Sequence, residues 1–247
     1  MTLTKHVPAN APKQSSTTQR GKSAAILNVQ EIVETISIDC LIFGLNKGQL
    51  EILLVKHGEG IREGDWGLPG GWIKHDEDLD VAAYRLLHDL TGLENIYLEQ
   101  FRSFGKANRY PTKRVVTIAY YALVRPEHYH IMAGFTASDV RWEKLSQCKG
   151  LIYDHDEMIA AGLEHLKSKV CREPVGFNLL PTKFTLLQLQ ELYEAILGVK
   201  LDKPNFRRKM IKTGLLIPCD EKQKDVPHRA AALYRFNKKA VFQQLTI

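Results

Sequence analysis

The stretch GGWIKHDEDLDVAAYRLLHDLTGL at residues 70–93 constrains the fold of this chain most strongly. A Gly/Pro-rich loop, GDWGLPGGW, leads into a helical pattern over Asp78–Thr91 that Gly92 stops. At about 100° per residue, the apolar side chains of this helix share one arc of roughly 140°. They are Leu79, Ala82, Ala83, Leu86, Leu87 and Leu90. A helix with so wide an apolar stripe packs on another layer, so the pattern predicts a glycine-rich loop and a helix covering a sheet.

Apolar runs elsewhere predict the strands of that sheet. The segment ISIDCLIFGLNKGQLEILLVKH combines an alternating run, the turn Asn46-Lys47-Gly48 and a second apolar run at Leu50–Val55, which is the pattern of a β-hairpin. Arg114–Val124 is apolar almost throughout and predicts a central strand buried on both faces. A short strand at Val140–Trp142 and an amphipathic helix at Asp154–Lys169 complete a mixed α/β sandwich.

The pattern changes at KVCREPVG, which predicts a linker. Two short helices follow at Phe184–Val199 and Asp202–Thr213, the first opened by a capping box of Thr185 and Gln188. Two short strands around a polar loop come next, at 215–218 and 231–236. Helix, turn, helix and hairpin in this order predict a winged helix-turn-helix.

We therefore expect three parts: a mobile tail at 1–30, an effector-binding domain at 31–172 and a winged helix-turn-helix domain at 173–247. Residues 177–247 carry 13 Lys+Arg against 6 Asp+Glu, a net charge of +7 within a total of +6. A basic segment on a nearly neutral body is typical of a module that binds a polyanion. A generic solvated basic surface would give the same charge, so charge alone leaves both interpretations open.

The second of the two short helices has the layout of a DNA-reading helix. Its polar face contains no acid and spans roughly 100° of the helical wheel. This face is formed by Asn205, Arg208, Lys209 and Lys212, and the opposite, apolar face by Phe206, Met210 and Ile211. Arginine can pair with guanine and asparagine with adenine in the major groove. The remaining cations are expected to contact phosphates, from the helix or from the polar loop. They are Lys203, Arg207, Lys222, Lys224, His228 and Arg229. The two on the helix, Lys203 and Arg207, fall towards the apolar side of the wheel and could instead cover the core with their stems.

The opening stretch also resembles the Nudix box, G-x5-E-x7-R-E-U-x-E-E-x-G-U, in which U is a bulky apolar residue. The match runs through Gly71, Glu77, Arg85 and Gly92. In active members the box glutamates bind a divalent metal that activates water for diphosphate cleavage. At the three ligand positions after the arginine, this chain has Leu86, Asp89 and Leu90. We therefore expect no metal site and no hydrolase activity, with Glu77, Arg85 and Asp89 forming a structural network instead.

The whole chain after the tail resembles the Nudix-related transcriptional regulators, with an α/β/α Nudix sandwich followed by a winged helix-turn-helix. The resemblance includes FTLLQLQELYEAILG, LDKPNFRRKM and HRAAALYRF, although Pro204 replaces an expected basic residue. One branch of the family senses ADP-ribose. The segments DCLIFGLN, GLEN, RVVTIAYYALV and GFNLLP resemble more closely the branch that regulates L-arabinose and related pentose use.

That resemblance implies a cytoplasmic homodimer, a repressor or activator, that binds a palindromic double-stranded DNA operator. It also implies a small-molecule effector, a pentose or an ADP-ribose-like compound, and no cofactor. Its candidate contacts are polar, aromatic or glycine residues around the glycine-rich loop, each of which could also be ordinary surface or core. They are Lys56, Trp66, Gly70, Gly71, Lys74, Glu77, Asn108, Arg109 and Arg114.

Two other functions remain open from the sequence. A Nudix hydrolase acting on ADP-ribose or a nucleoside-diphosphate sugar would need acids from outside the box, such as Glu59, Glu63 or Asp65. Alternatively, the C-terminal part could dock a protein rather than DNA. No apolar run is long enough to cross a bilayer, and the four scattered cysteines predict reduced thiols rather than a zinc site.

Overall fold

The structure is a computed structural model that describes residues 32–173, 175, 179–224, 227, 229–237 and 239–240. The predicted tail at 1–30 lies outside these residues. Within them, no helix has both the length and the apolar character that a membrane span requires. The four cysteines are free thiols.

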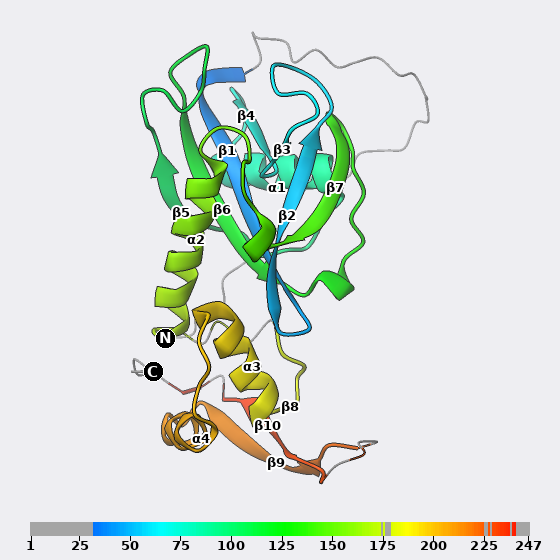
Figure 1. The fold of residues 1–247 in the computed structure, drawn as a ribbon, viewed down its shortest axis with the longest axis vertical. Coiled ribbons are helices and arrows are strands. Elements are labelled where there is room, and N and C mark those ends of the chain that lie inside the picture. Colours follow the sequence, from blue (N-terminus) through cyan, green and yellow to red (C-terminus); the bar gives the residue numbers. More distant parts are fainter. Residues whose placement is uncertain are drawn as a thin grey trace.

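An antiparallel hairpin forms the centre of the larger sheet (Figure 1). Strand β1 (Ile32–Asn46) pairs with β2 (Gln49–His57), and Leu45 lies opposite Leu50. Lys47 and Gly48 connect the two strands with φ angles of 48° and 75°. Positive φ at both central residues matches the twist of the flanking strands. The predicted hairpin is therefore confirmed.

The strand order of this sheet is β3-β2-β1-β6-β5. Strand β6 (Val116–Val124) lies parallel to β1 and is largely buried, which confirms the predicted central strand. Strand β5 (Glu99–Phe104) pairs antiparallel with β6 and was not predicted. Its sequence, EQFRSF, alternates half-buried with exposed residues and offers only a weak apolar pattern. Its place in the sheet depends on its neighbour rather than on its own composition.

The glycine-rich segment, predicted as a loop, contains two short strands. Strand β3 (Trp66–Gly67) pairs with β2, and β4 (Gly70–Lys74) pairs with β1. The prediction of a loop was wrong here because the backbone pairs with strands that lie far away in the sequence. Strand β7 (Ala137–Lys144) also pairs with β2 and contains the short strand predicted at 140–142.

One helix covers each face of the sheet. Along β1, Ile38 and Cys40 pack in the core with α1 (Leu79–Thr91), whereas Leu41 points to the other face, towards α2 (His155–Val170). The α/β/α sandwich is thus confirmed. Short 3₁₀ turns, η2 (Pro126–His128) and η3 (Leu145–Gln147), flank β7.

The C-terminal part is a winged helix. Its helices are α3 (Leu186–Leu197) and α4 (Lys203–Lys212). Its three-stranded sheet has the order β8-β10-β9 and consists of β8 (Phe184–Thr185), β9 (Leu216–Lys222) and β10 (Ala232–Phe236). Residues 184–185 therefore form a strand rather than the predicted first turn of the helix.

The two helices begin at the predicted caps. Thr185 and Gln188 form a reciprocal capping box on α3, and Asp202 Oδ1 accepts a hydrogen bond from Asn205 N at 3.0 Å. Phe206 and Met210 of α4 are buried. The placement of Ile211 on the apolar face was wrong, because its side chain is 49% exposed. Helix α4 buries only a narrow stripe, and residue 211 lies beside that stripe.

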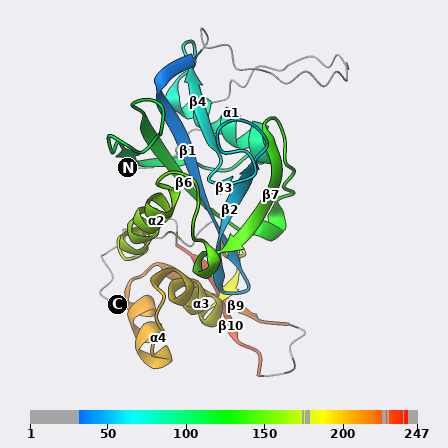
Figure 2. The same cartoon turned by 45° about the horizontal axis from the view of Figure 1, so that its top comes forward.

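The sandwich and the winged helix share one apolar cluster, which contains Leu166 and Val170 of α2 together with Leu192 and Ile196 of α3. In both views α3 lies where the β1–β2 turn and the end of α2 meet (Figure 2). Helix α3 contacts both α2 and β2. The two parts are thus joined by side-chain packing as well as by the chain.

Candidate functional site

An ion pair between Glu77 and Arg85 joins strand β4, the glycine-rich strand, to helix α1. Glu77 accepts a hydrogen bond from Lys74 N at 2.7 Å and one from Arg85 Nε at 2.8 Å. Arg85 Nη2 also donates to the carbonyl oxygen of Trp72 at 3.1 Å. Burial opposes ionisation of Glu77, but the hydrogen bonds from Arg85 and Lys74 prevail and lower its pKa. With Asp89 Oδ2 3.8 Å from Arg85 Nη1, the predicted structural network is confirmed.

The box positions that carry metal ligands in active Nudix enzymes lie in the core. Leu86 and Leu90 are 6% and 5% exposed. Leu86 packs so closely on Gly71 that a Cβ added to this glycine would lie 2.7 Å from Leu86 Cδ2. Among the described residues, no group of three or more His, Cys, Asp or Glu side chains is placed to hold a metal ion. The acids considered as substitutes lie in the turn at 58–65, where Glu59 and Glu63 are exposed and Asp65 pairs with Arg62 at 3.1 Å.

Behind the glycine-rich strand lies a buried polar cluster that the sequence did not reveal. Arg109 donates to Asp154 Oδ1 at 2.7 Å and lies 3.5 Å from Asp39 Oδ2. Thr117 Oγ1 donates to the same Asp39 oxygen at 2.7 Å. His155 Nε2 lies 3.6 Å from Asp39 Oδ1. The one signal available was Asp39 itself, a carboxylate inside an apolar strand.

His155 connects this cluster to the glycine-rich segment. Its Nδ1 accepts a hydrogen bond from Leu68 N at 2.9 Å. Burial lowers the pKa of His155, although the charge of Asp39 opposes the shift, so the imidazole is neutral and can act as this acceptor. The backbone passes so close that a Cβ on Gly70 would lie 2.2 Å from Asp39 Oδ1. The glycine at this position is therefore required by the cluster beneath it.

Aromatic rings line the same region. The ring centroids of Trp72 and Tyr110 are 5.7 Å apart, and those of Tyr110 and Tyr153 are 5.0 Å apart. Lys113 Nζ lies 4.4 Å from the centroid of the Trp72 ring. Tyr153 has a φ of 53°, a left-handed conformation that is uncommon for a bulky residue. These contacts bring the loop between β5 and β6 over the glycine-rich strand.

The predicted effector residues occupy three neighbouring segments. Lys56 and Trp66 are register partners in β2 and β3, and Arg141 stacks over the Trp66 ring at 3.9 Å. Gly70, Gly71, Lys74 and Glu77 lie on β4 and the turn before α1. Asn108, Arg109 and Arg114 lie in the β5–β6 loop. Within this third segment, Arg109 is only 7% exposed and is held by carboxylates, whereas Asn108 and Arg114 are exposed and Arg114 donates to the carbonyl of Lys106 at 2.9 Å.

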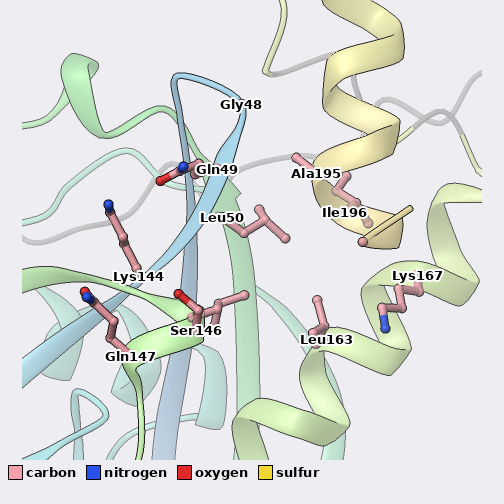
Figure 3. Close-up of a pocket in the computed structure, with 12 residues that line it drawn as sticks. Gly48, Gln49, Leu50, Lys144, Ser146, Gln147, Leu163, Lys167, Ala195 and Ile196 are labelled. Carbon is pink, nitrogen blue, oxygen red and sulfur yellow. The ribbon is translucent and has the colours of Figure 1, made fainter. Parts of the chain in front are cut away.

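A cavity of about 500 Å³ lies elsewhere, at the junction of the two parts (Figure 3). Its lining combines Gln49 and Leu50 beside the hairpin turn with Leu163 and Lys167 of α2 and Ile196 of α3. None of the nine predicted effector residues lines it. The glycine-rich region and this junction are therefore separate features of the molecule.

Helix α4 presents its cations outward from α3. Lys203, Arg207, Arg208 and Lys212 are exposed, and Asn205 and Lys209 are half-buried. Arg208 Nη2 donates to Asn205 Oδ1 at 2.9 Å. On the wing, Lys222, Lys224 and Arg229 are exposed, and His228 lies outside the described residues. With Phe206 and Met210 buried behind it, α4 exposes Arg208 and Lys212 as predicted. Lys203 and Arg207 are exposed as well, although the helical wheel placed them towards the apolar side, because the buried stripe of α4 is narrow.

Comparison with known proteins supplies two family matches. Residues 34–162 match the NUDIX domain model, and residues 176–236 match the NrtR DNA-binding winged helix domain model. The chain is 35% identical over 205 residues to the "ADPR responsive transcriptional repressor NtrR" of Acinetobacter baylyi, and the match covers 81% of each protein.

Two solved structures are also similar to this chain. The crystal structure of Shewanella oneidensis NrtR in complex with a 27mer DNA is similar with a TM-score of 0.69 at 30% identity, covering 82% of this chain and 94% of that one. The NUDIX domain of the same protein in complex with ADP ribose is 31% identical with a TM-score of 0.50, covering 53% of this chain and 88% of that one.

Proposed function

This chain belongs to the NrtR family of transcriptional regulators, in which a Nudix domain precedes a winged helix, and from that premise we propose that it is an ADP-ribose-responsive repressor. The observation that carries the DNA-binding part is the surface of α4, which has five Lys or Arg residues and no acid over Lys203–Lys212. Two apolar residues fix the opposite side of this helix against α3. A cationic helix held in this way fits the major groove.

We propose ADP-ribose as the effector because the relatives that name an effector name this one. The similar repressor is described as ADPR responsive, and the similar Nudix domain was solved with ADP ribose. The resemblance to the L-arabinose branch rests on short segments alone, and none of the relatives described above supports a pentose. A pentose therefore becomes the negative control of the test.

The proposed effector site consists of the three segments described above: β2 with β3, β4 with the turn before α1, and the β5–β6 loop. A diphosphate needs cations, and Lys56, Lys74 and Arg114 occur on its three segments. Adenine stacks on aromatic rings, and each of the three segments carries one, namely Trp66, Trp72 and Tyr110. The Gly70 and Gly71 backbone and Glu77 border the site, Asn108 is exposed beside it, and Arg109 supports it from below through Asp154.

Hydrolysis is not part of the proposed function. With leucine at positions 86 and 90, a Mg²⁺ ion at the box helix would lack two of its three carboxylates. Incubation of the protein with Mg²⁺ and ADP-ribose should release no AMP. Turnover that Glu77→Gln abolishes would establish the hydrolase alternative instead.

Helix α2 and strand β2 connect the proposed effector site with the winged helix. Helix α2 begins at the buried polar cluster, through Asp154 and His155, and its far end packs on α3. Strand β2 carries Lys56 near one end, and Leu50 at its other end joins the same apolar cluster. We propose that effector binding changes the orientation of the winged helix through these elements. In a homodimer on a palindromic operator, half-sites about 34 Å apart would then no longer be matched.

The test is DNA binding by the full chain. A sequence selected from a random DNA pool should bind with strong salt dependence, and ADP-ribose should weaken this binding whereas L-arabinose and xylose should not. The variant Lys56→Ala is expected to bind the DNA as wild type does but to need more ADP-ribose for release. Absence of sequence-selective binding at any salt concentration would overturn the proposal, and release by L-arabinose alone would replace its effector.

A further inference from the structure

We infer that Arg208 reads a guanine in each half-site and that Asn205 is the residue that positions it. This inference rests on the proposed function, because it assumes that α4 enters the major groove. It deepens that function by assigning one base-pair preference to one side-chain pair. The observation behind it is the hydrogen bond from Arg208 Nη2 to Asn205 Oδ1, at 2.9 Å.

The local backbone makes this pair well defined. Asp202 caps α4 by accepting the hydrogen bond from Asn205 N, so residue 205 is fixed in the first turn. Residues three apart share one face of a helix, so Arg208 lies directly after Asn205 on the exposed side. On the opposite side Phe206 and Met210 are buried, which fixes the rotation of α4 about its axis. The pair therefore points away from α3.

The hydrogen bond changes what each side chain can recognise. Pairing of asparagine with adenine uses both the amide oxygen, which accepts from N6, and the amide nitrogen, which donates to N7. Asn205 Oδ1 already accepts a hydrogen bond from Arg208, so a bidentate contact with adenine would have to use the second lone pair of the same oxygen. Arg208 uses one of its five N–H donors on Asn205, and the remaining four suffice for guanine O6 and N7.

The hydrogen bond between Asn205 and Arg208 also reduces the conformational entropy that Arg208 loses on binding DNA. An arginine side chain is long and samples many rotamers in solution, and the bond to Asn205 removes part of this freedom before DNA is met. The neighbouring exposed cation Lys212 has a flexible stem and a point charge, which suits phosphate contacts. The pair and Lys212 should therefore respond differently to mutation.

The experiment measures base preference at every operator position for the full chain and its variants. A selected operator is substituted one base pair at a time, and affinity is measured by fluorescence anisotropy. Arg208→Ala should relax the preference for G·C at one position of each half-site by roughly tenfold to a hundredfold. Lys212→Ala, the matched control, should weaken binding to all sequences alike and reduce the salt slope by about 1.

The variants of Asn205 distinguish positioning from direct readout. Asn205→Ala should weaken the G·C preference at the position that Arg208→Ala affects, and the double variant should lose little more. Asn205→Asp keeps the acceptor oxygen but not the amide donor, so it should retain that preference at lower overall affinity. Loss of preference at a separate A·T position in Asn205→Ala would show that Asn205 reads adenine and would overturn the inference. So would unchanged preferences in Arg208→Ala, whereas failure of the wild-type chain to select any sequence would instead refute the proposed function.

Discussion

At the scale of single residues, helix α1 shows how a binding frame persists without its metal ligands. The ion pair between Glu77 and Arg85 still joins the helix to the glycine-rich strand. Leu86 and Leu90 have become part of the core, where a carboxylate would be costly. The positions that would hold a metal thus contribute packing energy instead.

Truncation of Leu86 tests this role in packing. Leu86→Ala should lower the free energy of unfolding by about 2–5 kcal/mol, because it leaves a cavity against Gly71 and the sheet. Val81→Ala is the control in the same helix, since Val81 is 53% exposed and its truncation should change stability by less than about 0.5 kcal/mol. Urea denaturation provides the measurement. Equal effects of the two substitutions would contradict the buried position of Leu86.

The Glu77–Arg85 pair predicts a dependence on pH. Because the folded protein lowers the pKa of Glu77, the pair stabilises the fold above the pKa of the unfolded chain, near 4.5, and loses this contribution as pH falls through the lower, folded value. Arg85→Met should destabilise the protein at pH 7 by about 2 kcal/mol. This difference should shrink in unfolding experiments below pH 4.5. A difference that stays constant with pH would show that Arg85 acts only by packing.

At the scale of elements, helix α2 depends on a close approach to the sheet. Gly162 lies against β1, and a Cβ at this position would be 2.5 Å from Leu41 Cδ2 and 3.3 Å from the Phe43 ring. Glycine normally weakens a helix relative to alanine by roughly 0.5–1 kcal/mol. At this site the space available matters more than the intrinsic preference.

Gly162→Ala should therefore destabilise the protein, by about 1–3 kcal/mol, despite the better helix propensity of alanine. Ser168→Ala, at an exposed position of α2, should be neutral or slightly stabilising. Thermal unfolding compares the two variants. An increase in Tm for Gly162→Ala would mean that α2 lies farther from β1 than the structure shows.

The N-cap of α4 is expected to affect DNA binding as well as stability. Asp202→Ala removes the acceptor for Asn205 N and should cost about 1 kcal/mol of stability. Operator binding should weaken too, because the start of the reading helix becomes less ordered. Asp202→Asn keeps a capping oxygen and should bind DNA at least as well as the wild type. Full DNA affinity in Asp202→Ala would show that the cap is unimportant for reading.

At the scale of the whole molecule, burial lowers the pKa of three histidines among the residues that the structure describes, His57, His155 and His165. The folded protein therefore binds fewer protons than the unfolded chain near pH 6. The associated stability is fully present above the unfolded histidine pKa of about 6.5 and is lost as pH falls through the folded values.

We expect the free energy of unfolding to decrease between pH 7.5 and 5.5. His155→Gln should make this dependence weaker, because glutamine does not titrate and its amide oxygen can still accept from Leu68 N. Urea denaturation at several pH values measures the slope for both proteins. An unchanged slope in the variant would show that His155 does not contribute to acid sensitivity.

The sequence by itself determined the elements whose signals are local. The hairpin turn, the apolar stripe of α1 from Ala82 to Leu90, the caps of α3 and α4 and the acid-free face of α4 each depend on residues within a few positions of one another, and each occurs in the structure. Leu79, which the sequence also placed in that stripe, is 36% exposed because it lies in the first turn of α1, beyond the buried residues. The loss of metal ligands from the Nudix box could be predicted for the same reason, because the box is a local motif. Ile211 was misplaced because a helical wheel gives an angle but not the width of the surface that buries it.

Only the tertiary structure decided the rest, because the contacts involved join distant residues. Strands β3, β4 and β5 depend on backbone partners in other strands rather than on their own composition. The buried cluster brings Arg109 to Asp154, 45 residues away, and His155 to Leu68, 87 residues away. The packing of α2 on α3 likewise joins two parts of the chain across the linker. Local patterns predict the secondary structure of each segment. Which charges are buried and which strands pair depends on contacts that form only when distant segments pack together.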